Sequence, residues 1–344
     1  MTVTVARRAD ELHQHYTPGA RRAVVMTLGA LHAGHASLID AARRRLDADA
    51  AGAPRGQLVV TVYVNPLQFG QGEDFDRYPR TLDADVRLAE AAGADLVYAP
   101  DDAELYPGGP PLVRVSAGPM GELLEGASRP GHFDGVLTVV AKLLHLVRPD
   151  IACFGAKDAQ QVALIRRMVA DLDFPVEIVE LPTVREPDGL ALSSRNRYLS
   201  RPERRTALAL SRALFAARDR LAAEGALKAR AAAVTAGGSD RTAERAAGLA
   251  ALHERRASAD AHAVAAVSRS LTAPGSARAA ARVVLDEAAT LDPPLRLDYV
   301  ALVDPADFTE VPDDFSGEGI LLVAARVGGT RLIDNIRLTL GGVA

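Results

Sequence analysis

Short apolar runs alternate with longer amphipathic stretches between residues 21 and 184. The short runs, which predict strands, lie at 23–29, 57–66, 95–100, 151–156 and 176–184. The longer stretches repeat apolar side chains at the i, i+3, i+4 and i+7 spacing of a helix, and they lie at 35–50, 81–93, 134–147 and 158–172. This alternation predicts an α/β fold: a Rossmann-like parallel sheet with right-handed crossovers and helices on both faces. Ligands of such sheets bind at the carboxyl ends of the strands.

The pattern changes after residue 184. We therefore expect a Rossmann-like domain over 1–184 and a smaller C-terminal α+β lid domain over 185–344. Residues 221–280 hold 23 alanines among 60, which favours helix but supplies few large apolar side chains for a core. We expect this stretch to be a loosely packed helical insertion, partly disordered. Strand-like runs that predict a small sheet return at 295–304, 319–328 and 330–340.

The composition is that of an ordinary globular protein. The 344 residues are 48% hydrophobic and 24% charged, with a formal net charge of -4, so there is no general excess of positive charge for nucleic acid. The N-terminus lacks the apolar stretch of a signal peptide, and no run of about 18 apolar residues could span a bilayer. These features predict a cytoplasmic protein that binds neither nucleic acid nor membrane.

Cysteine and lysine are scarce, and their positions are informative. The single cysteine, Cys153, lies in an apolar run and is expected to be a small buried side chain rather than a catalytic thiol. Only three of the 40 basic residues are lysines, namely Lys142, Lys157 and Lys228. A lysine retained in such an arginine-rich chain is a candidate for function.

Two histidines lie where the first long strand is expected to give way to a helix. The pattern TxGxxHxGH comprises Thr27, Gly29, His32, Gly34 and His35. Small residues let a ligand approach the backbone, the first-turn N–H groups of a helix attract anions, and two imidazoles at i and i+3 face one pocket. Phosphate is the expected ligand. The sequence has no P-loop, strand-linked GxGxxG, HExxH, paired CxxC or GxSxG motif, which argues against the site types that those motifs mark.

The histidine turn resembles the HIGH-type signature of the nucleotidylyltransferase superfamily, which implies attack on the α-phosphate of ATP. Four further motifs follow: VNPLQFGQGEDFDRYPRT (64–81), EGASRPGHFDGVLTVVAKLLHLVRPD (125–150), FGAKDAQQVALIRRM (154–168) and DGLALSSRNRYLS (188–200). Together the five collinear motifs are similar to the pantothenate synthetase (pantoate-beta-alanine ligase) family. The resemblance covers about 23–214 and resumes from about 286, and the alanine-rich stretch has no recognised counterpart.

The resemblance implies an ATP-dependent ligase of pantothenate (vitamin B5) and coenzyme A biosynthesis. Pantoate's carboxylate would attack the ATP α-phosphate, releasing pyrophosphate, and the β-alanine amine would then displace AMP from pantoyl adenylate. Such transfers depend mainly on positioning and charge stabilisation, so cations and N–H donors are expected in the site. The resemblance also implies Mg²⁺ bound with ATP, through protein ligands that the sequence does not name, and a homodimer.

The same resemblance assigns roles to individual residues. The catalytic candidates are His32, His35, Lys157 and Arg195. The implied ATP-binding residues are Leu28, Gly29, His32, Gly34, His35, Gly155, Lys157, Asp158, Val184, Leu192, Ser193, Ser194 and Arg195. Gln68 and Gln161 are assigned to pantoate, Gln68 also lies near β-alanine, and a loop with Arg129 and His132 approaches the phosphates or the substrate. Leu28 replaces the family's usual methionine, a swap of similar volume that is expected to alter binding only modestly.

Two other interpretations are open at this point. One is a different transferase of the same superfamily, including a tRNA synthetase, although the C-terminal half lacks the basic appendage that tRNA binding requires. The other is a regulatory protein that binds ATP without turnover. The presence of His32, His35, Lys157 and Arg195 argues against a sensor, which has no need of groups directed at developing charge.

Overall fold

The computed structural model describes residues 3–48, 54–236 and 273–341, and it divides into two compact units. The first comprises Met1–Tyr198 with Ala306–Phe308, and the second comprises Leu199–Pro305 with Thr309–Ala344. This division differs from the expected boundary at 184/185. Residues 185–198, which carry the Ser193–Arg195 loop, fall in the first unit rather than in the C-terminal domain.

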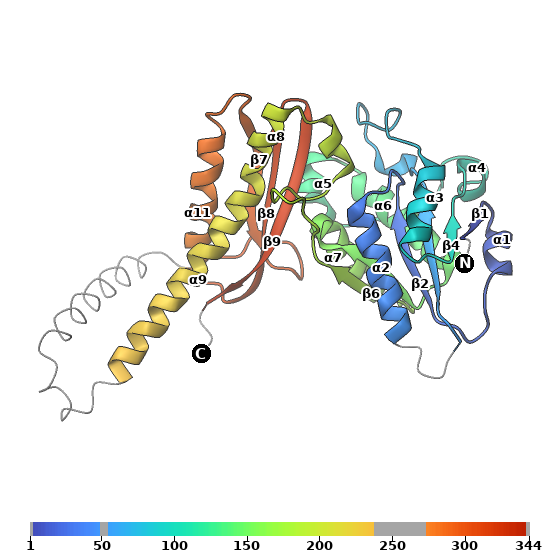
Figure 1. Ribbon diagram of the computed structural model, residues 1–344, viewed down its shortest axis with the longest axis horizontal. Coiled ribbons are helices and arrows are strands. Elements are labelled where there is room, and N and C mark those ends of the chain that lie inside the picture. The colour runs from blue at the N-terminus through green and yellow to red at the C-terminus, as the bar shows by residue number, and fades with distance from the viewer. Residues whose placement is uncertain (1–2, 49–53, 237–272, 342–344) are drawn as a thin grey trace, which may run out of the picture. The chain divides into compact units, whose positions relative to one another are not determined.

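The first unit is built on a six-stranded parallel sheet with the order β1-β4-β3-β2-β5-β6 (Figure 1). The strands are β1 (Thr4–Ala6), β2 (Arg22–Thr27), β3 (Gln57–Val62), β4 (Leu96–Tyr98), β5 (Ile151–Gly155) and β6 (Glu177–Leu181). Four of them lie within the predicted runs, β2 begins one residue before its predicted run, and the predicted Rossmann-like fold is confirmed. The edge strand β1 was not predicted, because three residues are too few to show a period-2 pattern.

Helices cover both faces of this sheet. The longer ones are α1 (Ala9–Gln14), α2 (Ala33–Ala48), α3 (Leu82–Ala91), α6 (His132–Val147) and α7 (Ala159–Asp171), and the shorter ones are α4 (Asp102–Leu105), α5 (Glu125–Ser128), η1 (Pro66–Gln68), η2 (Pro119–Glu122), η3 (Ala156–Asp158) and η4 (Ser194–Tyr198). Successive residues of β2 face opposite cores. Val24 packs in one cluster with Val140 and Val162, from α6 and α7, whereas Val25 packs in the other with Ile39 of α2.

The connections reverse direction at the middle of the sheet. From β2 the chain passes through α2 to β3 on one side, and from β5 it passes through α7 to β6 on the other. β2 and β5 are themselves neighbours, with Val25 opposite Cys153. In open α/β sheets this switch point opens a crevice at the carboxyl ends of the two strands, and that is where ligands bind. The histidine turn follows β2, and the segment with Lys157 follows β5.

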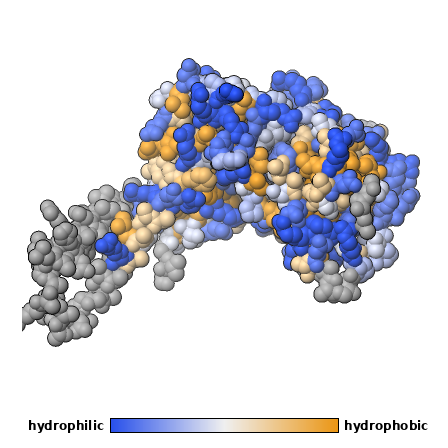
Figure 2. All heavy atoms as spheres, in the orientation of Figure 1, coloured by the Kyte–Doolittle hydropathy of each residue, from blue (hydrophilic) through white to orange (hydrophobic). Residues whose placement is uncertain are grey.

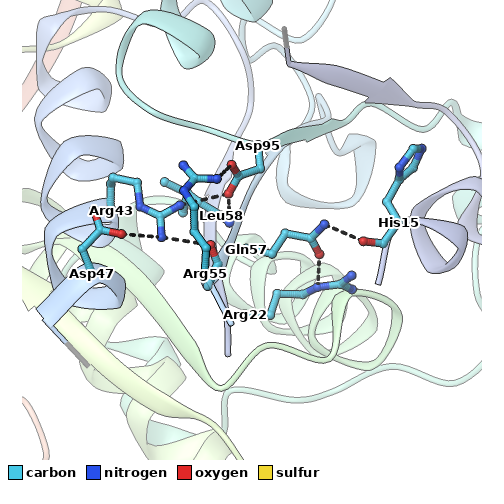
Figure 3. A network of polar contacts seen from close by, with 9 residues as sticks. His15, Arg22, Arg43, Asp47, Arg55, Gln57, Leu58 and Asp95 are labelled. Atoms are coloured by element: carbon cyan, nitrogen blue, oxygen red, sulfur yellow. Dashed lines mark hydrogen bonds and ion pairs between the residues drawn. The ribbon is translucent and has the colours of Figure 1, made fainter. Parts of the chain in front are cut away.

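A polar network ties the opposite, amino-terminal ends of the strands together (Figure 3). The Arg22 guanidinium donates to the Gln57 side chain at 2.8 Å and to the Val147 carbonyl at 2.8 Å. The Asp95 carboxylate accepts from Arg43 at 3.0 Å, from the Leu58 N–H at 2.8 Å, and also from Arg55. These contacts lie away from the crevice, so their role is in stability.

Replacing Asp95 by alanine is expected to destabilise the protein by about 3 kcal/mol, because it removes the more buried of the two carboxylates, Asp95 and Asp47, that pair with the largely buried Arg43 guanidinium. Urea unfolding followed by circular dichroism measures this loss. At a temperature where the variant stays folded, its kcat is expected to match the wild type, and a fall in kcat would contradict a purely structural role.

The second unit combines a three-stranded antiparallel sheet, β7-β8-β9, with helices (Figure 1). Its elements are α8 (Arg201–Ala207), α9 (Ala209–Ala236), α11 (Ala273–Ala288), β7 (Leu295–Val303), β8 (Gly317–Val327) and β9 (Thr330–Leu340). The three predicted strands and the α+β class are confirmed. Residues 237–272 of the alanine-rich stretch lie outside the described residues. The helices α9 and α11, which lie on either side of residues 237–272, contact each other. Alanines of these two helices, such as Ala217 and Ala281, are fully buried.

Cys153 lies in the middle of β5 with 1% of its surface exposed. Burial raises the pKa of its thiol to about 12. The reactive thiolate is therefore scarce at neutral pH, and the expectation of a buried, unreactive cysteine holds.

Hydrophilic side chains dominate much of the visible surface of the first unit, with hydrophobic side chains gathered in smaller patches (Figure 2). Among the described residues, no helix combines the length and the hydropathy that a membrane span requires.

Candidate active site

A buried carboxylate holds the turn that follows β2. Gly29 and Ala30 both adopt positive φ, at 86° and 51°. Asp85, from α3, accepts hydrogen bonds from the N–H groups of Ala30 at 3.1 Å and Leu31 at 2.8 Å. Thr81, at the start of α3, donates its hydroxyl to the same carboxylate at 3.2 Å. Asp85 therefore fixes the backbone from which the two histidines project.

The two imidazoles lie together at the N-terminus of α2, with ring centroids 4.1 Å apart. The backbone N–H of His32 donates to Nδ1 of His35 at 3.2 Å, and the N–H of Gly34 donates to Nδ1 of His32 at 3.1 Å. A neutral imidazole that accepts at Nδ1 carries its proton on Nε2. Both rings therefore present an Nε2–H donor.

Both histidines are neutral at physiological pH. Burial lowers the pKa of His35 to about 3, assisted by His32 and Lys157. Burial likewise lowers the pKa of His32, and the nearby charges of Lys157 and Arg197 act in the same direction. Two neutral N–H donors at a helix N-terminus form an anion site that does not depend on histidine protonation.

Gly34 allows the close packing of this turn. A Cβ at this position would lie 2.9 Å from Cε1 of His32 and 3.5 Å from Cβ of Leu192. Leu192, predicted to contact ATP, is thus brought beside the histidine turn.

Gly34→Ala is expected to push the His32 ring out of place and to lower kcat about tenfold to a hundredfold, since misplacement of about 1 Å costs this much. The unfolding midpoint is expected to change little, because alanine favours helix more than glycine. Steady-state kinetics and thermal unfolding of the variant test this. Unchanged kcat would show that the His32 ring can move without loss.

Lys157 follows β5 directly, in η3. Its charge acts on both His32 and His35, so all three residues share the end of the β2–β5 pair. Lys157 Nζ lies 3.6 Å from the Asp158 carboxylate, which is half exposed. The predicted grouping of the histidines with Lys157 at the switch point is what the structure shows.

The Ser193–Arg195 loop approaches the same region. Arg195 donates to Asp74 at 3.0 Å. Burial alone would lower the pKa of Arg195, but the hydrogen bond and charge of Asp74 outweigh burial and raise it. The negative charge of Asp158 also raises the pKa of Arg195. Burial raises the pKa of Tyr78, and the hydrogen bond of Ser194 and the charge of Arg195 oppose this rise. The loop therefore brings a permanent cation to the Lys157–Asp158 segment.

Gln68 ends η1, and a charged network surrounds its main chain. The Gln68 carbonyl accepts from Nδ1 of His132 at 2.8 Å, and Arg129 donates to Nε2 of His132 at 3.0 Å. Burial, helped by Arg129, lowers the pKa of His132 to about 4, so this histidine is neutral. Arg129 also pairs with Glu73. Burial alone would raise the pKa of Glu73, but the hydrogen bond and charge of Arg129 outweigh burial, so the pKa of Glu73 is lowered.

The remaining predicted residues lie on neighbouring elements. Gln161 is in the first turn of α7, half buried. The adjacent Gln160 is fully engaged: it accepts from the Glu125 N–H and donates to the carbonyls of Met120 and Leu123. The Val184 carbonyl accepts from the Leu192 N–H at 2.9 Å, which brings these two predicted ATP contacts together at the base of one loop.

A cavity of about 330 Å³ lies behind the histidine turn, at the ends of β2, β3 and β4. Leu28, Gly29 and Asp85 form its wall on the side of the turn. Leu28, the departure from the family pattern, thus lines this cavity.

Several residues that shape the site were missed from sequence, namely Asn65, Glu73, Asp74, Tyr78, Asp85 and Tyr106. Each lies outside the histidine and lysine motifs. The only signal for the first four, and for Asp85's partner Thr81, was their place within the motif at 64–81.

Comparison with known families shows which family the chain belongs to. The family model described as Pantoate-beta-alanine ligase matches residues 2–337. The chain belongs to this family. It is therefore an ATP-dependent ligase acting on pantoate and β-alanine, and the resemblance seen in the sequence is confirmed. This assignment excludes a tRNA synthetase and argues against a sensor without turnover.

Relatives agree over nearly the whole chain. The pantothenate synthetase of Streptomyces avermitilis is 67% identical over 345 residues, covering 100% of both chains. That of Streptomyces coelicolor is 68% identical over 335 residues, covering 97% of this chain and 95% of the relative. The crystal structure of pantothenate synthetase from Thermus thermophilus has a TM-score of 0.74 at 39% identity, covering 97% of this chain and 99% of that chain.

A pantoate-beta-alanine ligase structure from Francisella tularensis, described as complexed with beta-gamma ATP and beta-alanine, is also similar. Its TM-score is 0.63 at 26% identity, and 97% of each chain is covered.

Proposed function

We propose that the crevice at the ends of β2 and β5 is where this ligase forms pantoyl adenylate. The observation that carries the proposal is the pair of neutral Nε2–H donors at the N-terminus of α2, with Lys157 acting on both. ATP lies with its phosphates against these donors and the helix N-terminus. Pantoate's carboxylate oxygen attacks the α-phosphorus, the bond to the bridging oxygen breaks, and pyrophosphate leaves. His32, His35, Lys157 and Arg195 stabilise the charge that develops.

The second step forms the amide. The β-alanine amine, in its neutral form, attacks the acyl carbon, the acyl–oxygen bond breaks, AMP leaves with the electron pair, and the nitrogen loses a proton. Gln68 and Gln161 hold pantoate, and Gln68 also faces β-alanine. Gly155, Asp158, Val184 and Leu192 line the nucleotide, with Asp158 suited to accept from ribose hydroxyls. Ser193 and Ser194 accompany Arg195 over the phosphates.

Arg195 pairs with Asp74 in the structure. Binding of the ATP phosphates therefore involves exchange of a carboxylate partner for a phosphate partner, both of which suit the guanidinium fork.

Magnesium fits this site as an ion carried by ATP. Among the described residues no group of three or more His, Cys, Asp or Glu side chains is arranged to hold a metal. The half-exposed Asp158 offers one hard oxygen ligand beside Lys157. Mg²⁺ commonly binds through substrate phosphates and water with one or two carboxylates, and there it neutralises phosphate charge.

We also propose that the enzyme acts in the cytoplasm as a homodimer, as the family resemblance implies. Two large apolar side chains of the first unit, Leu112 and Val113, are almost fully exposed and support a contact with a second chain. Light scattering on the purified protein measures its mass in solution. A monomeric mass at micromolar concentration would contradict the dimer.

Chromatography of the reaction mixture tests the proposed reaction. ATP, Mg²⁺ and pantoate alone are expected to give pyrophosphate and enzyme-held adenylate, and AMP and pantothenate are expected only when β-alanine is added. ATP that stays intact in both mixtures would overturn the proposal. Cleavage with a different acid alone would keep the superfamily mechanism and change the substrate.

A further inference from the structure

The turn after β2 contains a backbone conformation that is unfavourable without support. Gly29 has a φ of 86°, which glycine adopts freely, but Ala30 has a φ of 51°, which residues with a Cβ rarely adopt. Ala30 is also buried, with 2% of its surface exposed. Such a conformation persists only where surrounding contacts stabilise it.

Asp85 provides these contacts with both of its oxygens. Oδ2 accepts from the Ala30 N–H at 3.1 Å, and Oδ1 accepts from the Leu31 N–H at 2.8 Å and from the Thr81 hydroxyl at 3.2 Å. Asp85 is only 1% exposed. Because the two backbone N–H groups can only donate, a carboxylate satisfies both of them and a neutral amide cannot.

Packing gives the turn less support on the side of the cavity. Leu28 and Gly29 line that cavity, whose volume is about 330 Å³, and a cavity supplies no atoms for van der Waals contact. The position of the turn therefore depends strongly on its hydrogen bonds to Asp85.

The next peptide group along the chain carries this support to the histidines. The N–H of His32, which directly follows Leu31, donates to Nδ1 of His35 at 3.2 Å. The His32 ring accepts from the Gly34 N–H and lies 4.1 Å from the His35 ring, measured between centroids. A shift of the Leu31 peptide would thus displace both rings.

We propose that Asp85 is a positioning residue for adenylate formation, which directs the Nε2–H groups of His32 and His35 at the phosphates by holding the Ala30–Leu31 backbone. The inference rests on the proposed role of the two histidines in the ligase reaction. Asp85 acts through the turn, so its loss is expected to reduce stabilisation of the transition state more than binding of ATP.

Asp85→Asn keeps the shape of the side chain but places an NH₂ group against one of the two backbone N–H groups, whichever way the amide lies. The kcat is expected to fall about tenfold to a hundredfold, since misplacement of about 1 Å costs this much. The KM for ATP is expected to change less than about threefold. Asp83→Asn, the same change at an exposed carboxylate in the same helical turn, is expected to leave both values unchanged. Equal kcat for the wild type and Asp85→Asn would overturn the inference.

Nitrogen NMR of the histidine rings distinguishes positioning from a purely structural role. In the wild type both His32 and His35 are expected to carry the proton on Nε2, because Nδ1 accepts from a backbone N–H. In Asp85→Asn the His35 ring is expected to populate both tautomers. His132 binds the Gln68 carbonyl through Nδ1, so it has the opposite tautomer and is an internal reference. Unchanged tautomers of His35 in a variant with lowered kcat would contradict action through the turn.

Relief of the backbone strain provides a second test. Ala30→Gly removes the penalty of the positive φ, so in the Asp85→Asn background it is expected to restore kcat about threefold to tenfold. In the wild-type background, where Asp85 already holds the turn, it is expected to change kcat less than about twofold. An equal effect of Asp85→Asn in both backgrounds would mean that Asp85 does not act on this conformation.

Thr81→Val decides the question if Asp85→Asn does not fold. It keeps the shape of an exposed side chain and removes only the hydroxyl that binds the carboxylate. The kcat is expected to fall about twofold to fivefold, and wild-type kcat would then overturn the inference. Wild-type enzyme that left ATP intact with pantoate would overturn the proposed function and this inference with it. An active wild type with unaffected variants overturns the inference alone.

Discussion

Lys157→Met is expected to lower the rate of pyrophosphate release about a hundredfold to a thousandfold while the thermal unfolding midpoint stays near that of the wild type. Methionine keeps the length of the apolar stem and removes only the charge. Lys157 acts on both His32 and His35, so its ammonium lies where the proposed mechanism places the negative charge that builds up on the phosphates. The loss is expected in kcat, since that charge is greatest in the transition state.

Lys228→Met provides a matched control, because Lys228 is exposed on α9 in the second unit. It is expected to retain wild-type kcat. The same Lys157 variant has a spectroscopic signature: removing a nearby positive charge raises the pKa values of His32 and His35, which histidine-selective NMR titration detects. A folded Lys157→Met enzyme with normal kcat would remove Lys157 from the mechanism.

Stability is expected to fall steeply as the pH decreases from about 6.5 toward 4. The folded-state pKa values of His35, about 3, and His132, about 4, both lie below the ordinary value of 6.5. In this window the unfolded chain therefore binds protons that the folded chain excludes, and acid favours unfolding. Each histidine contributes a slope of about 1.4 kcal/mol per pH unit. Above about pH 7 neither state is protonated at these sites, and their contribution is constant.

Urea unfolding at a series of pH values measures this slope. His132→Asn is expected to reduce it by about 1.4 kcal/mol per pH unit, whatever its effect on stability at pH 7. The control is His15→Asn. His15 is exposed and lies near the amino-terminal ends of the strands, opposite the crevice, so this substitution is expected to leave the slope unchanged. A slope in His132→Asn equal to that of the wild type would mean that this histidine is already protonated in the folded protein.

Much of the fold followed from the sequence because the central strands are buried on both faces. β5 is a continuous apolar run and β3 is interrupted only by Thr61 after its first residue; a short apolar run flanked by amphipathic helices is typical of a buried parallel strand. β1 and α1 were missed because they span three and six residues, too few for periodicity to register. The unit boundary was misplaced because the segment after β6 returns to the first unit through contacts such as Arg195 with Asp74, which no local pattern encodes.

The same distinction applies to the site. The histidines and Lys157 were predictable because each belongs to a recognisable motif that directly follows a predicted strand. Asp85 was not: on α3 it reads as an ordinary polar helix residue, and only the fold shows it buried against the turn after β2. Asn65 and Tyr106 were missed for the same reason. They are hydrogen-bond partners that lie 41 positions apart in the sequence and meet only in the folded chain.

The shielded thiol in β5 makes this enzyme convenient to label. Cys153 is the one native cysteine, and its burial keeps it in the unreactive thiol form. A cysteine introduced at the exposed position of Gln71 would be the sole target for a maleimide dye, with no cysteine-free background required. A fluorophore there would report, in real time, whether the segment carrying Glu73 and Asp74 moves when ATP binds, as the proposed exchange of the Arg195 partner implies.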